Sequence, residues 1–104
     1  MAKALRIVLV SADWEKSSSL ARKACEEASK QVGIEFTERK EDWEYLTRHG
    51  LKDEYGGVDI PQVFVEFDDG TVVHVMTKVP LTSNGKPDVE GAIKMIIEKV
   101  RGVA

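Results

Sequence analysis

Cysteine is nearly absent from the chain, and its scarcity narrows the possible functions. Cys25 is the only cysteine among 104 residues, so no disulfide can form within the chain. We therefore expect a reducing compartment, the cytoplasm. The chain has no Cys and His residues with the spacing of metal ligands, and no glycine-rich phosphate loop. We accordingly expect no metal and no other cofactor.

Excess positive charge and long apolar runs are also missing. The net charge is −3, whereas proteins that bind nucleic acids or anionic membranes usually carry a basic patch. No apolar run approaches the roughly 18 residues of a membrane span, and residues 1–4 lack the layout of a signal peptide. We expect neither nucleic acid nor a membrane as a partner. Asn84 is the only asparagine and 32% of the residues are charged, which favours a thermophilic source.

The length and composition of the chain predict one globular domain, which covers residues 1–104. Hydrophobic residues make up 42% of the chain, enough for a core at this length. Pro61 stands directly before a β-branched and aromatic run, residues 62–67. Asp69-Gly70 then marks a hairpin turn before a second run, residues 71–76. This stretch predicts two antiparallel strands, the first beginning where the missing N–H of proline is tolerated.

The first half of the chain predicts a strand, a helix and a second strand. Residues 5–11 are nearly continuously apolar, as expected of a central strand that is covered on both faces. A helix is predicted from the serines at 17–19, which offer N-caps, to about Val32. Gly33 is placed to end it in a left-handed conformation. Residues 34–38 alternate between apolar and polar side chains, which predicts a half-buried strand.

The remaining segments are predicted to be two helical regions and, from Lys78 to Lys86, an irregular loop that contains Pro80, Asn84 and Gly85. Residues 42–55 read as two short helical pieces broken at Gly50, with inward-facing side chains at Trp43, Leu46, Leu51 and Tyr55. Pro87 fits the first turn of a last helix that ends at Gly102, and its predicted buried face is Val89, Ala92, Ile93, Ile96, Ile97 and Val100. The element order is therefore β-α-β-α-β-β-α. The first two strands should be parallel, because a helix joins them.

Several of these segments resemble the thioredoxin-like superfamily in its compact, glutaredoxin-sized form. The run from Val8 to Trp14 resembles the strand and loop that lead to a thioredoxin active site. Residues 51–56 resemble the helix end before the proline strand, and Ile60-Pro61-Gln62-Val63-Phe64-Val65 resembles the cis-proline strand of the family. The resemblance implies an α/β fold with a four-stranded mixed central sheet, helices on both faces, and a cis Ile60–Pro61 bond.

The residues that carry the chemistry of that family are missing. The positions of its Cys-x-x-Cys motif read Glu15-Lys16-Ser17-Ser18, and the position of its buried acid is Leu9. Serine at a helix N-terminus has no redox chemistry comparable with that of a low-pKa thiol. We therefore expect a redox-inactive protein without catalytic residues. It is not a dithiol oxidoreductase, and the sequence favours a protein that is not an enzyme.

The surface beside Pro61 is the predicted binding site. The resemblance implies that the backbone before this proline pairs with an extended partner chain through main-chain hydrogen bonds, which require no particular side chain. We therefore expect a peptide or protein partner. The predicted binding residues are Trp14, Glu15, Lys16, Ser17, Ser18, Asp59, Ile60 and Pro61.

Two alternatives stay open. The first is a glutathione-dependent or other thiol-handling enzyme that uses one of the serines at 17–19 in place of cysteine, although helix capping explains these serines more simply. The second is a small structural subunit that dimerises through a sheet edge or the last helix, so the oligomeric state is left open. Cys25 is expected to be buried and inert. His49 lacks a neighbouring nucleophile or acid, and His74 is expected at the surface or half-buried.

Overall fold

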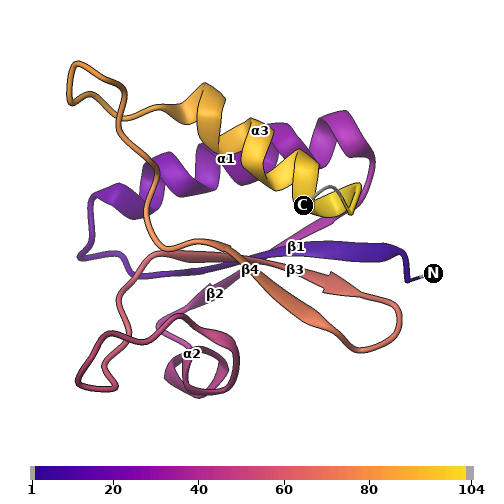
Figure 1. Cartoon of the computed structure of the whole chain (residues 1–104), viewed down its shortest axis with the longest axis horizontal. Coiled ribbons are helices and arrows are strands. Elements are labelled where there is room, and N and C mark those ends of the chain that lie inside the picture. Colours follow the sequence, from indigo (N-terminus) through magenta and orange to yellow (C-terminus); the bar gives the residue numbers. More distant parts are fainter. Residues whose placement is uncertain (1, 103–104) are drawn as a thin grey trace.

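The computed structural model describes residues 2–102, and it has the element order that the sequence predicts. Figure 1 shows the arrangement of these elements. Their bounds are β1 (Ala4–Ser11), α1 (Ser17–Val32), β2 (Glu35–Lys40), α2 (Trp43–His49), β3 (Gln62–Phe67), β4 (Val72–Met76) and α3 (Val89–Val100). The predicted fold class, an α/β domain of the order β-α-β-α-β-β-α, is confirmed.

The four strands form one mixed sheet in the order β2-β1-β3-β4. β1 is parallel to β2, which the intervening α1 makes possible, and antiparallel to β3. β3 and β4 form the predicted hairpin, with Gly70 at a positive φ of 88° in its turn. This topology is compatible with a thioredoxin-like fold. No helix in residues 2–102 has both the length and the apolar character that crossing a membrane requires.

Helices cover both faces of the sheet, with α1 and α3 on one side and α2 on the other (Figure 1). β1 supplies both cores. Ile7 and Leu9 belong to the cluster beneath α1 and α3, whereas Val8 and Val10 belong to the cluster beneath α2. All four side chains are fully buried, and each contributes about 1.5–3 kcal/mol to folding. This burial on both faces explains why the strand is nearly continuously apolar.

The long helices lie where they are predicted, but the start of α3 differs. Gly33 ends α1 at a φ of 71°, and its N–H donates to the carbonyl of Ser29 at 2.9 Å. Asp88, not Pro87, begins α3, because its carboxylate accepts the N–H of Gly91 at 2.8 Å. Pro87 therefore precedes the cap and lies outside the first turn. The predicted inner face is buried at Ala92, Ile93, Ile96 and Ile97, and partly buried at Val89 and Val100.

The prediction for residues 42–55 was wrong in two respects. Only α2 is helical, and the second helical piece is replaced by a turn in which the carboxylate of Asp53 accepts the N–H groups of Tyr55 and Gly57, both at 2.9 Å. Side chains of this type compete with helix formation by bonding nearby backbone. Trp43, Leu51 and Tyr55 are exposed, whereas Tyr45 and Leu46 are the residues that α2 buries.

Candidate functional site

Three loops leave the same end of the sheet and form the candidate site. Val10, near the end of β1, pairs with Gln62 at the start of β3, and Val63 pairs with Met76 at the end of β4. The segments 12–16, 50–61 and 77–88 therefore lie at the same end, the left side of Figure 1. We call these three segments the loop end. All the predicted binding residues except Ser17 and Ser18, which begin α1, belong to it.

Hydrogen bonds shape the loop that carries Trp14. The N–H of Ala12 donates to the buried Ser18 Oγ at 3.2 Å, and the N–H of Glu15 donates to the carbonyl of Ala12 at 3.1 Å. Ser17 donates its N–H and its hydroxyl to Glu15 Oε1, at 3.3 and 3.0 Å. These bonds, the backbone N–H first, lower the pKa of the Glu15 carboxyl. The loop is therefore closed on itself, and the Trp14 side chain is left outside it.

The predicted role of the serines as helix N-caps was wrong. Lys16 occupies the N-cap of α1 and makes no side-chain cap. The hydroxyl of Ser18 closes the preceding loop, and that of Ser19 donates to the carbonyl of Lys16 at 2.9 Å. The physical reason is that the carboxylate of Glu15 already accepts the first free N–H group of the helix, that of Ser17.

A buried glutamine holds the segment before β3. Gln62 is fully buried, and its Oε1 accepts the N–H of Leu51 at 2.9 Å. Its Nε2 donates to the carbonyls of Leu51, at 3.2 Å, and Asp59, at 3.0 Å. The Ile60–Pro61 bond is cis, as expected. Both side chains are buried and Asp59 is exposed. Among residues 2–102, neither the N–H nor the C=O of Ile60 has a hydrogen-bond partner.

The most exposed large apolar side chains of the described chain all lie at the loop end. They are Trp14 at 62%, Leu51 at 59%, Tyr55 at 89% and Leu81 at 66% exposed, one or two from each loop. The other exposed large apolar residues, outside the loop end, do not exceed 44%. The sequence pattern predicted Trp14 as a binding residue. It predicted buried side chains at Leu51 and Tyr55, however, and gave no prediction for Leu81. The turn-forming glycines, asparagine and prolines around them were the available signal.

An ion-pair network fixes the other side of the Trp14 loop. Glu38 of β2 accepts two hydrogen bonds from the guanidinium of Arg22, at 2.7 and 2.6 Å, and one from the hydroxyl of Ser11. These partners, Arg22 first, lower the pKa of the Glu38 carboxyl to about 2. Lys40 lies 3.7 Å from Glu38 and also pairs with Asp13. The network ties the end of β1 to β2 and α1, and the sequence pattern gave no sign of it.

Cys25 is buried in the middle of α1, as predicted. Burial raises the pKa of its thiol, so almost no thiolate forms at neutral pH. With one cysteine in the chain, no Cys-x-x-Cys active site exists. We expect iodoacetamide to label Cys25 only after denaturant unfolds the protein, which mass spectrometry of native and unfolded samples measures. Rapid labelling of the native protein would contradict the buried position.

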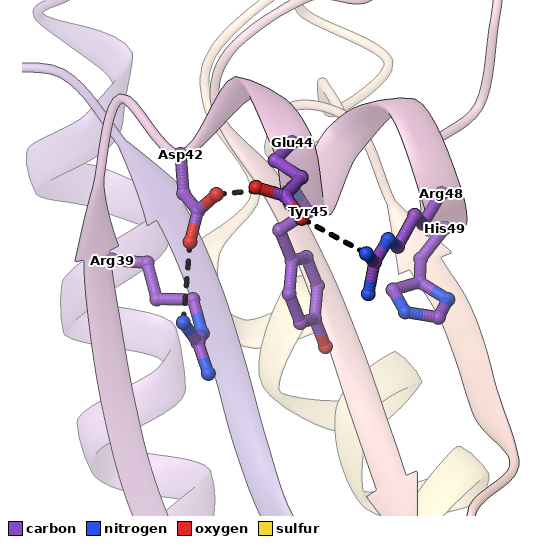
Figure 2. A pocket seen from close by; sticks show the side chains of 6 residues that line it. All are labelled: Arg39, Asp42, Glu44, Tyr45, Arg48 and His49. Atoms are coloured by element: carbon purple, nitrogen blue, oxygen red, sulfur yellow. Dashed lines mark hydrogen bonds and ion pairs between the residues drawn. The ribbon is translucent and has the colours of Figure 1, made fainter.

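A hollow between β2 and α2 is lined mainly by charged side chains, which form two ion pairs (Figure 2). It encloses about 350 Å³. Arg39 pairs with Asp42 at 3.1 Å, and Arg48 pairs with Glu44 at 2.9 Å. The ring of Tyr45 lies between Arg39 and His49. The hydroxyl of Tyr45 donates a hydrogen bond to the carboxylate of Glu66 at 2.7 Å. Both arginines of this hollow are paired with carboxylates, so we take the loop end as the stronger candidate.

The histidines show no catalytic arrangement. His74 is half-buried on β4, as expected, with its ring 5.6 Å from that of Phe64 and its Nε2 3.0 Å from the hydroxyl of Thr77. His49 is half-buried against Tyr45, with ring centroids 4.8 Å apart. Within residues 2–102, no group of three or more His, Cys, Asp or Glu side chains is placed to hold a metal ion.

Comparison with known proteins does not assign the chain to a family. No protein-family model matches it, and the curated proteins contain no match to it. The element order, the mixed sheet and the geometry of the loop end are therefore the grounds on which its function has to be argued.

Proposed function

We propose that the chain is a redox-inactive thioredoxin-like domain that binds an extended peptide or protein segment at the loop end. The observation that carries the proposal is that the three loops at this end bear the four most exposed large apolar side chains of the described chain. Exposed apolar groups on one side of a small domain mark an interaction surface more often than scattered single ones do. Aromatic residues such as Trp14 and Tyr55 are typical anchors of such surfaces.

The backbone beside Pro61 supports an extended partner. Within residues 2–102, neither the N–H nor the C=O of Ile60 has a hydrogen-bond partner, and its side chain is held in the core with Val8 and Phe64. A partner strand that pairs with these groups would satisfy them, as in other complexes formed by strand addition. Its side chains would then meet exposed apolar side chains of the neighbouring loops, such as Trp14 and Leu51. Asp59 and Lys78 supply the charged rim.

The thiol-handling enzyme has less support than the binding domain. The hydroxyl of Ser17 already donates to Glu15, and the hydroxyl of Ser18 is buried as the acceptor for Ala12. A serine that assists a bound thiol has to direct its hydroxyl at the ligand. The hydroxyls of Ser17 and Ser18 hold the loop together instead, and that of Ser19 donates to the carbonyl of Lys16 at 2.9 Å. We therefore assign the serines a positioning role for the loop that bears Trp14.

Replacing the anchor tests the proposal. The probe is a synthetic peptide selected from a random library on the immobilised protein, called the library peptide below. We expect Trp14→Ala to weaken its binding at least about ten-fold, because central aromatic anchors contribute about 2 kcal/mol or more. Trp43→Ala is the matched control, since Trp43 is the other tryptophan of the chain and is exposed on α2, outside the three segments of the loop end. Isothermal titration calorimetry measures both.

The control distinguishes binding at the loop end from nonspecific binding to any exposed tryptophan. Trp43→Ala should bind the library peptide as tightly as the wild type does. Equal losses in the two variants would mean that any exposed tryptophan suffices. Full affinity in Trp14→Ala would remove Trp14 from the site. Glutathione titrated into the wild type tests the enzyme alternative, and we expect no binding heat from it.

A further inference from the structure

The outer side of α3 carries a stripe of charges beside a shallow groove. Its four exposed charged side chains are Glu90, Lys94, Glu98 and Arg101. They border a hollow of about 610 Å³, which Ile93 and Ile97 of α3 also line. This face lies on the helical layer formed by α1 and α3 (Figure 1). Of the residues that line the hollow, only Asp88, the N-cap of α3, belongs to the loop end.

The charges of this stripe are not used within the described chain. Seven ion pairs join side chains of residues 2–102, and none of them involves a residue from Glu90 to Arg101. Glu90, Lys94 and Glu98 have the four-residue spacing that permits pairs along one helix. Because no such pairs form, all four charged side chains of the stripe are available for ion pairs with another molecule.

The stripe is complementary to itself when its direction is reversed. Along α3 it reads acid, base, acid, base, so an antiparallel copy reads base, acid, base, acid. Glu90 then faces Arg101 of the second copy, and Lys94 faces its Glu98. A two-fold axis near the middle of the helix makes each of these contacts twice. We infer that α3 is a self-association surface, on which a second copy of this chain docks antiparallel.

The size of the face predicts a weak dimer. The 12 residues of α3 extend over about 18 Å, so two such helices bury less than the roughly 1,200 Å² of a standard interface. Exposed ion pairs are also screened by salt. The dimer should therefore form at high protein concentration and dissociate at high ionic strength, while the loop end of each copy stays accessible.

Sedimentation equilibrium of the full chain measures the association. Between about 10 µM and 1 mM at low salt, the mass should rise from 11.6 kDa toward twice that value. Lys94→Glu and Glu98→Lys should each weaken association at least about ten-fold, because each places like charges opposite one another. Glu44→Lys makes the same charge change on α2, at the opposite face of the sheet, and should leave association unchanged.

Mixing the two variants gives the decisive result. A Lys94→Glu copy and a Glu98→Lys copy carry opposite charges at both positions, so the mixture should form a heterodimer although each variant alone is monomeric. The double variant that exchanges the two charges should recover the association of the wild type. A wild type that stays monomeric up to 1 mM overturns the inference. The inference is also overturned if Lys94→Glu and Glu98→Lys each associate as strongly as the wild type. The same holds if the two variants form no heterodimer when they are mixed.

Discussion

Replacing Gln62 with leucine is expected to lower the free energy of unfolding by about 3 kcal/mol. Leucine fits the same volume but cannot make the three hydrogen bonds from the Gln62 carboxamide to the backbone of Leu51 and Asp59. An unsatisfied buried polar group costs about 1–3 kcal/mol. Water can reach part of the exposed loop, so the total stays below the sum of three such costs. Urea denaturation followed by circular dichroism measures the loss.

The same substitution should weaken peptide binding, because Gln62 positions the backbone from Asp59 to Pro61. Gln31→Leu is the matched control: Gln31 is the only other glutamine in the chain, and it is exposed on α1. Its loss should change stability by less than about 0.5 kcal/mol. A Gln62→Leu protein that is as stable as the Gln31→Leu protein would show that the carboxamide does not hold the loop.

The ion-pair network around Glu38 makes the free energy of unfolding depend on pH in the acidic range. The folded-state pKa of Glu38 is lowered to about 2, chiefly by Arg22. A carboxyl whose pKa is lowered by folding stabilises the protein fully above its unfolded-state pKa. This contribution is lost as the pH falls through the folded-state value. The contribution of Glu38 should therefore be complete at pH 7 and decline from about pH 5 to about pH 2.

Glu38→Gln isolates this contribution. At pH 7 the variant should be less stable by about 2 kcal/mol, because it leaves the partly buried guanidinium of Arg22 without its charged partner. Near pH 2 the variant and the wild type should converge. Glu27→Gln, at an exposed position of α1 outside the ion pairs of residues 2–102, serves as control. A difference between Glu38→Gln and wild type that is the same at pH 7 and pH 2 would contradict the assignment.

The elements of the fold could be predicted because their signals are local. The apolar run of β1, the period of α1 and α3, the glycine after α1 and the Asp69-Gly70 turn all lie within short windows of sequence. Residues 42–55 were mispredicted, since apolar character was taken as burial at Leu51 and Tyr55. A folded surface always contains apolar side chains, and the turn around Asp53 outcompetes a second helical piece.

The candidate site could be predicted only in outline. Trp14 and the segment before β3 were assigned to it because each flanks a strand with a recognisable pattern, and their role in binding stays a prediction. The role of Gln62 and the pairing of Arg22 with Glu38 depend on residues that meet only after folding. Leu81 lies in an irregular loop, and no periodicity connects it with Trp14. Tertiary contacts of this kind leave no trace in a single sequence.

Amide chemical-shift mapping tests the central claim most directly. The library peptide is added to ¹⁵N-labelled wild-type protein, and the shift of each backbone amide is followed to saturation. The largest changes should fall on residues 12–16, on Asp59 and Ile60, and on residues 77–81. Changes centred on α3 or around Tyr45, with the loop end unaffected, would contradict a docking surface beside Pro61.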